Sequence, residues 1–277
     1  MYYGHTLSLG RNFMGSRGDA DAAAYVAAVV AAGGTVSGAQ ATAINDFYVS
    51  AKADSYYTSL KRLYLPIWGV AAANAIDMIG LTSGTFVGGV THAAGYVQGN
   101  GSTGYFSLGV TGIAAGLTNA SGLICALVKQ APSGVGFAAM ISSQTTPSDR
   151  TQLYVSGNSS GNAVETGQGV GTFAAHVGTR ATNLGIYVST RESTTSLKLY
   201  SRKTSGFTLH DTEVFDNSSG SACANTLTAM ASSGTSIFSD AQFGALGIGL
   251  GINLTHTTSF TLALKNLWET TTGLTLL

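Results

Sequence analysis

The dipeptide Leu65-Pro66 divides the chain into two parts of different character. Before it, alanine-rich stretches carry apolar residues at helical spacing. After it, short apolar runs alternate with Gly, Ser, Thr and Asn, and charges are few. Runs of this length and spacing are typical of strands joined by tight turns. The sequence therefore predicts a small helical piece followed by a large antiparallel β-sandwich or jelly roll.

The part before the proline is predicted to contain three short helices. Asp19 opens a helix over 22–32, which Gly33-Gly34 ends. Ser37-Gly-Ala-Gln40 has the form of a capping box and opens a second helix. A third helix is expected over 54–64, because apolar residues recur there at helical spacing and a proline follows. Such short helices need a surface to pack against.

The part after the proline is predicted to form the sandwich. The organisation expected is an N-terminal arm over 1–18, a helical segment over 19–73 and a β-sandwich domain over 74–277. A first strand in place of the arm remains an alternative. Strands are expected at 75–81, 86–90, 105–110, 123–129, 136–141, 152–155, 172–177, 183–191, 195–202, 207–215, 226–231 and 243–250, the pair 183–191 and 195–202 as a hairpin.

The C-terminal stretch allows two predictions. Thr257 or Ser259 caps a helix that runs through Trp268 and ends at Thr272-Gly273. The alternative is one more strand, because Thr-Ser-Phe-Thr-Leu-Ala-Leu also alternates. We favour the short helix.

Composition excludes several classes of protein. Only 9% of residues are charged and the net charge is zero, against about 25% charged residues in typical domains. The basic pairs Lys61-Arg62 and Arg202-Lys203 are too few for nucleic-acid binding. The N-terminus lacks a signal-peptide core, and no apolar run has membrane-helix length, so synthesis in the cytosol without membrane insertion is expected. Cys125 and Cys223 are interpreted as buried thiols, although a disulfide remains open.

Candidate chemical groups are sparse. Asp211 and Glu213, with Asp216 nearby, form the densest acidic group, and on a strand the first two carboxylates share a face about 6–7 Å apart. That spacing suits a glycosidase, which needs two carboxylates. A solvated strand edge is the simpler interpretation, because Trp68 and Trp268 lie in linker or helical contexts and offer no sugar platform.

Other motifs do not form a site. The histidines lack metal-ligand spacing, no nucleophile elbow appears, and Gly99–Gly104 is interpreted as a hairpin loop without a P-loop lysine. The RGD triplet at 17–19 is interpreted as a helix start. Tyrosines are candidates for sugar contact by residue type alone: Tyr96, Tyr105, Tyr154 and Tyr187. We therefore assign no catalytic, cofactor-binding or metal-binding residue and expect no enzyme activity and no cofactor.

The order of these features resembles a virion protein module of tailed bacteriophages that has a concanavalin A-like (lectin/glucanase, laminin-G-like) jelly roll. The resemblance runs from about residue 19 to the end, although the helices here are richer in alanine than the family pattern. Five stretches carry it: Asp19-Ala-Asp-Ala-Ala-Ala-Tyr-Val, Gln40-Ala-Thr-Ala-Ile-Asn, Leu60 to Trp68, Ala245-Leu-Gly-Ile-Gly-Leu-Gly and Ala263-Leu-Lys-Asn-Leu-Trp-Glu-Thr.

The resemblance implies a non-enzymatic structural or accessory protein of a phage virion, in the tail or as a head decoration or fibre. It implies other virion proteins as partners and a homo-oligomer such as a trimer. The alternative is a lectin-like module that recognises a host-surface glycan, and a glycoside hydrolase is the third hypothesis. A fold resemblance does not transfer function by itself.

Overall fold

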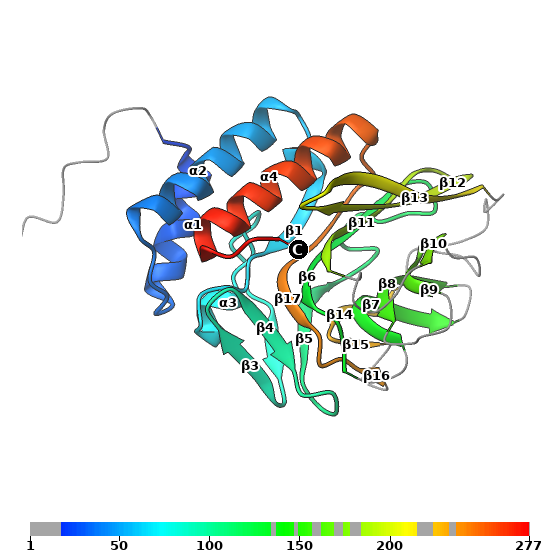
Figure 1. Cartoon of the computed structure of the whole chain (residues 1–277), viewed down its shortest axis with the longest axis horizontal. Coiled ribbons are helices and arrows are strands. Elements are labelled where there is room, and N and C mark those ends of the chain that lie inside the picture. The colour runs from blue at the N-terminus through cyan, green and yellow to red at the C-terminus, as the bar shows by residue number, and fades with distance from the viewer. Residues whose placement is uncertain are drawn as a thin grey trace, which may run out of the picture.

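The computed structural model describes residues 18–133, 137–146, 149–156, 162–168, 174–177, 184–214, 224–232 and 237–276 (Figure 1). The predicted arm (apart from Gly18), Asp216 and Cys223 lie outside the described residues. The side chains of some strand residues are also outside the description, among them those of Asp211 and Glu213.

The first two predicted helices are confirmed. Helix α1 spans Ala20–Ala31, and the side chain of Asp19 caps it by accepting from the backbone N–H of Asp21. Helix α2 spans Gly38–Ala53, and Ser37 and Gln40 form the reciprocal capping box. These local side-chain contacts satisfy helix N–H groups that have no partner within the helix.

The predicted third helix over 54–64 is wrong. A short 3₁₀ turn, η1 (Tyr57–Ser59), leads into strand β1 (Leu60–Tyr64), which pairs antiparallel with β17 (Gln242–Gly249). Two glycines of β17 allow the close approach: a Cβ at residue 249 would lie 2.3 Å from the carbonyl oxygen of Ser59, and one at residue 247 would lie 3.1 Å from Leu63. Pairing with a distant strand thus overrides the helical spacing of the apolar residues.

The predicted strand over 75–81 is also wrong. Helix α3 (Ala71–Asn74) is followed by turns around the buried Asp77. The Asp77 carboxylate accepts backbone N–H groups from Leu63, Ile79 and Gly80, at 2.8, 2.9 and 2.8 Å. Because one carboxylate satisfies three backbone donors, this segment needs no strand ladder.

Two antiparallel sheets contain most of the strands of the described chain. Sheet I has the order β13-β12-β11-β6-β17-β4-β3, with β1 beside β17; sheet II has the order β10-β9-β8-β7-β14-β5-β2. The remaining strands of sheet I are β3 (Val90–Ala93), β4 (Tyr96–Gly99), β6 (Gly122–Gln130), β11 (Gly185–Ser193), β12 (Ser196–Lys203) and β13 (Gly206–Val214). Those of sheet II are β2 (Thr85–Val87), β5 (Tyr105–Thr111), β7 (Phe137–Thr146), β8 (Asp149–Ser156), β9 (Asn162–Gln168), β10 (Ala174–Val177) and β14 (Thr226–Ala229). A small ribbon joins β15 (Ala231–Ser232) to β16 (Ile237–Phe238).

The expected sandwich is confirmed, and the β11–β12 hairpin forms with Ser193 opposite Ser196. Strands β4 and β9 were not predicted. The predicted strand over 86–90 is split between β2 of sheet II and β3 of sheet I. The loop Gly99–Gly104 is not a hairpin, because it joins β4 of sheet I to β5 of sheet II.

The C-terminal stretch forms helix α4 (Leu254–Thr272), so the strand alternative is wrong. Its cap is Asn253, one turn earlier than predicted, and Gly273 ends it in the left-handed conformation as predicted. The alternating threonines fit a helix because their hydroxyls bond to backbone carbonyls of the preceding turn, as Thr261 does to Thr257.

The molecule has three layers: helices, sheet I and sheet II (Figure 1). One apolar core joins α1, α2 and α4 to the outer face of sheet I through Leu123, Cys125 and Leu127. The other core fills the space between the sheets, where the intervening residues Ile124 and Ala126 point. Strand β6 is therefore apolar on both faces, which is typical of a buried central strand.

Cys125 is confirmed as a buried free thiol, and burial raises its pKa to about 12. In the part of the chain that is described, no helix is both long enough and apolar enough to span a membrane.

Candidate functional site

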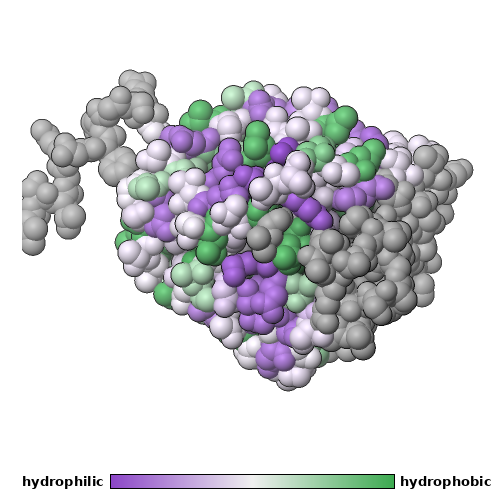
Figure 2. All heavy atoms as spheres, viewed as in Figure 1, coloured by the Kyte–Doolittle hydropathy of each residue, from purple (hydrophilic) through white to green (hydrophobic). Residues whose placement is uncertain are grey.

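Beside the helical layer, strands β4 and β6 end and β17 begins on the outer face of sheet I. There Tyr96, Gln98 and Lys129 are half-buried, and Gln242 is 8% exposed. Val97 and Phe243 pair across β4 and β17 and point into the core between the sheets. Because side chains alternate along a strand, Gln98 and Gln242 point to the outer face. Figure 2 shows a hydrophilic area there, directly below the C-terminus and over these strands.

Four side chains meet in this area: Tyr96, Gln98, Lys129 and Gln242, which we call the lysine–amide patch. They form a directional chain of hydrogen bonds. Lys129 Nζ donates to Gln242 Oε1 at 3.4 Å, and Gln242 Nε2 donates to Gln98 Oε1 at 3.2 Å. Gln98 Nε2 then donates to the carbonyl oxygen of Asp240 at 2.9 Å. The chain fixes the orientation of both amides.

The cation of this patch also faces an aromatic ring. Lys129 Nζ lies 4.7 Å from the centroid of the Tyr96 ring, within the range of a cation–π contact. Within the described residues no carboxylate forms an ion pair with Lys129, whereas Lys52, Lys198 and Lys265 each have at least one. An ammonium group has three N–H donors, so Lys129 keeps donors for an incoming oxygen.

A hollow of about 220 Å³ adjoins Lys129 on the side of the C-terminal segment. Trp268, Leu274 and Leu276 line it. The volume is below the range of about 300–1,000 Å³ that drug-sized ligands occupy. The hollow and the patch together offer one apolar wall, one aromatic ring, one cation and two amides.

The backbone beneath Tyr96 is held by the helical layer. Trp268 Nε1 donates to the carbonyl oxygen of Gly95 at 3.1 Å. Gly95 has φ +94°, a conformation that other residues rarely adopt, and a Cβ there would lie 2.9 Å from Leu274. Helix α4 therefore determines where strand β4 begins and where Tyr96 lies.

Of the tyrosines named from the sequence, Tyr96 alone belongs to this patch. Tyr187 is fully buried between the sheets, and Tyr154 is 8% exposed with its hydroxyl 3.3 Å from Ser142 Oγ on sheet II. Tyr105 is half-buried on β5 of sheet II. The buried position of Tyr187 rules it out as a surface ligand.

The acidic candidates lie on β13, the edge strand of sheet I, where Asp211 is opposite Leu199 and Glu213 is opposite Leu197. Their side chains lie outside the description, so the carboxylate separation stays a prediction. Among the described residues no group of His, Cys, Asp and Glu has a metal-binding arrangement. His92 instead bonds to Asn74 at 3.1 Å, and His210 bonds to Ser201 at 2.6 Å.

Gln98, Lys129 and Gln242 were not predicted from the sequence. One local signal could have indicated Lys129. It is the first residue of β6 that is not buried, and by alternation it lies on the same outer face as Leu127. No local pattern brings Gln98 to Gln242, which is 144 positions further along the chain. Their contact exists because β4 pairs with β17.

No protein-family model matches the chain, and no curated protein matches its sequence. Solved structures do match its fold. Domain 4 of an extracellular GH43 arabinanase from Geobacillus stearothermophilus, in complex with arabinotriose, aligns with TM-score 0.50 and 12% identity, over 74% of this chain and 98% of that one.

Two botulinum neurotoxin structures align as well. A type C structure, described with an interaction with two ganglioside molecules, has TM-score 0.54, 12% identity and coverage of 77% of this chain and 53% of that one. The type DC binding domain in complex with SialylT has TM-score 0.52, 12% identity and coverage of 76% and 52%. This chain thus spans about half of the toxin chains. At such identity the likeness shows the β-sandwich fold alone.

Proposed function

We propose that the protein is a carbohydrate-binding module and that the lysine–amide patch holds the sugar. The observation that carries the proposal is the meeting of Tyr96, Lys129 and the two amides of Gln98 and Gln242 on the outer face of sheet I, where all but Gln242 are half-buried. A lectin-like module was the alternative hypothesis from the sequence, next to a structural protein of a virion.

The chemistry of the patch suits a sugar. A sugar ring offers hydroxyl groups at its edge and C–H groups on its faces. A tyrosine has an apolar ring and a polar hydroxyl, which match both kinds of surface. The amides of Gln98 and Gln242 still have an N–H each, because the chain of bonds uses one N–H of each amide.

Lys129 determines the class of sugar in this proposal. With no carboxylate paired to it among the described residues, its charge is available to a ligand. A charge-assisted hydrogen bond is about twice as strong as a neutral one. The preferred ligand is therefore an acidic sugar, whose carboxylate lies against Lys129 while its ring lies on Tyr96 or in the 220 Å³ hollow.

The comparisons support a binding role. The arabinanase domain is in complex with arabinotriose, the type C toxin is described with ganglioside molecules, and the DC binding domain is in complex with SialylT. Three structures that align with this chain are thus described with a ligand, although fold alone does not decide function.

The test is binding of the full chain to a glycan array that contains neutral and acidic glycans, followed by titration of the best ligand. Lys129→Met should weaken binding of an acidic glycan by roughly tenfold to a hundredfold, the effect of one hydrogen bond to a charged group. Tyr96→Ala should weaken binding of acidic and neutral glycans alike.

The matched control is Lys61→Met, which changes the net charge equally but affects a lysine bonded to the carbonyl oxygen of Thr58, outside the patch. It should leave affinity unchanged. An array on which no glycan binds, or equal affinity for the Lys129→Met and wild-type proteins, would refute the proposal.

The setting of this module stays a prediction. We place it in a phage virion, as the resemblance implies, assembled as a homo-oligomer and in contact with other virion proteins. Mass spectrometry of purified particles tests this. Turnover of a glycan that is lost in Asp211→Asn, Glu213→Gln would support the glycosidase hypothesis instead.

A further inference from the structure

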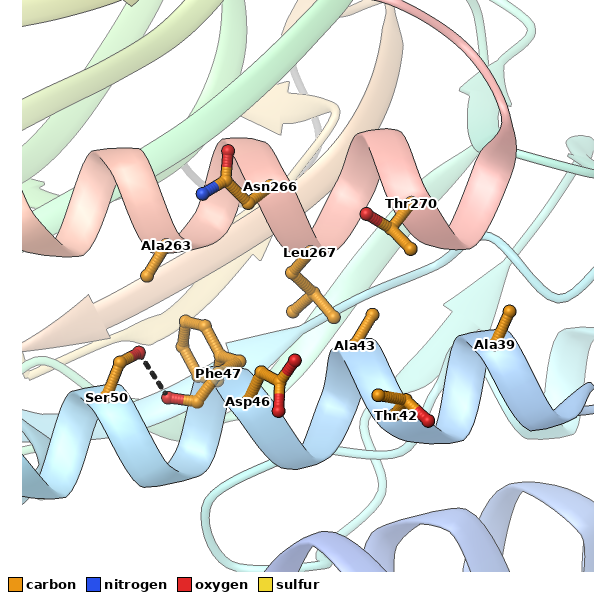
Figure 3. A pocket seen from close by; sticks show the side chains of 10 residues that line it. All are labelled: Ala39, Thr42, Ala43, Asp46, Phe47, Ser50, Ala263, Asn266, Leu267 and Thr270. Atoms are coloured by element: carbon orange, nitrogen blue, oxygen red, sulfur yellow. Dashed lines mark hydrogen bonds between the residues drawn. The ribbon is translucent and has the colours of Figure 1, made fainter.

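A groove runs between α2 and α4 on the solvent side of the helical layer, with a volume of about 480 Å³ (Figure 3). Its floor is apolar: Phe47 and Leu267 are buried, and Ala43 and Ala263 are half-buried. Figure 3 shows these side chains directed between the two helices. Two small alanines at a helix–helix contact leave the space that larger side chains would fill.

The rim of the groove carries Asp46, which forms no ion pair with any cation in the described part of the chain. Asp46 is exposed, and its one hydrogen bond among the described residues is the weak donation from Asn45 Nδ2, at 3.4 Å. By contrast, Asp19 and Asp21 at the start of α1 both pair with Lys52 at 2.7 Å. A groove with an apolar floor and a negative rim suits an apolar segment with positive charge.

Residues 1–17 of this chain have that composition. They include Leu7, Leu9, Phe13 and Met14 among six large apolar or aromatic residues after Met1, two arginines, and neither Asp nor Glu. The segment joins the described body at Gly18, in front of Asp19, whose N–H donates to Asn45 Oδ1 at 2.8 Å. The segment therefore starts beside Asn45 of α2, the residue that precedes Asp46.

The segment is long enough to reach the groove. Side chains advance about 100° per residue around a helix, so Val49 lies between Asn45 and Asp46 on the surface of α2. Val49 is 50% exposed and gives an apolar path across the helix. The helix is about 10–12 Å wide, and the five residues before Gly18, Phe13 to Arg17, span up to about 17 Å when extended.

We infer that residues 1–17 dock in the groove of their own chain, with Phe13 or Met14 over Ala43 and Ala263 and with Arg11 beside Asp46. Attachment at Gly18 favours the same chain over a second copy, because a short tether gives an effective concentration in about the millimolar range. The surface is separate from the lysine–amide patch, so this inference does not depend on the proposed function.

Limited trypsin digestion of the native full chain tests the inference. Docking protects the bond after Arg11, and Asp46→Arg should speed its cleavage by roughly twofold to fivefold, the effect of one exposed ion pair, because it replaces an attraction by a repulsion. Phe13→Ala should also speed cleavage, and it alters no residue of the folded body. Each rate is divided by that of the matching synthetic peptide 1–17.

Asp54→Arg is the control, since Asp54 is an exposed acid at the end of α2 and does not line the groove. It should leave the cleavage rate unchanged. Equal normalised rates for wild type, Asp46→Arg and Phe13→Ala would overturn the inference. Protection that grows with protein concentration, together with dimers in sedimentation, would also overturn it, because the groove would then hold the segment of a second copy.

Discussion

The indole of Trp268 connects the helical layer to the strand that carries Tyr96. The side chain is 1% exposed, and its Nε1–H donates to the Gly95 carbonyl at 3.1 Å. It lies against Gly244, where a Cβ would be 2.3 Å from Nε1. Trp268→Phe keeps an aromatic ring in this place and removes the donor.

The cost of this substitution follows from the buried carbonyl. An unpaired buried acceptor costs about 1–3 kcal/mol, and the smaller ring adds a cavity term above Gly244. With a urea dependence of about 3 kcal/mol per molar, the unfolding midpoint should fall by roughly 0.3–1 M. Because Gly95 precedes Tyr96, affinity for the best glycan should fall as well.

Urea unfolding followed by far-ultraviolet circular dichroism measures the midpoint, and fluorescence of the remaining Trp68 gives a second probe. The two transitions should coincide, because the helices and sheet I share one core. The control Leu262→Ala, on the same helix but 45% exposed, should be nearly neutral. A Trp268→Phe midpoint equal to that of wild type would show that this bond does not hold the layers together.

Three further predictions concern the framework. Gly251→Ala should destabilise the protein by at least about 1–3 kcal/mol, because the added Cβ would lie 1.8 Å from the Arg191 carbonyl oxygen. Gly38→Ala is the control, because the space around Gly38 is open, and it should not destabilise the protein; thermal unfolding of both variants measures the difference. Cys125 should react with iodoacetamide only as fast as the protein unfolds, measured by mass spectrometry of its peptide, and rapid labelling would contradict its burial. Burial raises the pKa of Asp77 above 3.8. This shift adds to the free energy of unfolding below about pH 3.8, and the added stability is lost as the pH rises through the raised pKa. Urea midpoints should depend less on pH in Asp77→Asn than in the wild type, and an unchanged profile would refute this.

Helix starts and the sandwich class were predictable because their causes are local. The capping side chains of Asp19, Ser37 and Gln40 lie within three residues of the N–H groups they bind. Gly273 ends α4 at the residue that tolerates a left-handed conformation. Alternating apolar runs predict strands for the same reason, since period 2 places one face on a core.

The failed predictions have non-local causes. Residues 60–64 have helical spacing, yet they form a strand because the glycines of β17 leave room beside them. Residues 75–81 have an apolar run, yet they form turns because Asp77 binds three backbone donors, including that of Leu63 on β1. The sequence of residues 60–64 does not show that β17 lies beside them, or that β17 has glycines at the points of contact.

The sequence by itself determined the class of fold, the capped helices and the absence of a recognisable catalytic motif, since these depend on neighbours within a few residues. The tertiary structure alone decided which side chains meet. Gln98, Lys129 and Gln242 come from three strands and form one patch because β17 lies between β4 and β6 in sheet I. The order of strands in a sheet depends on the packing of the whole core, so it cannot be predicted from a local sequence pattern.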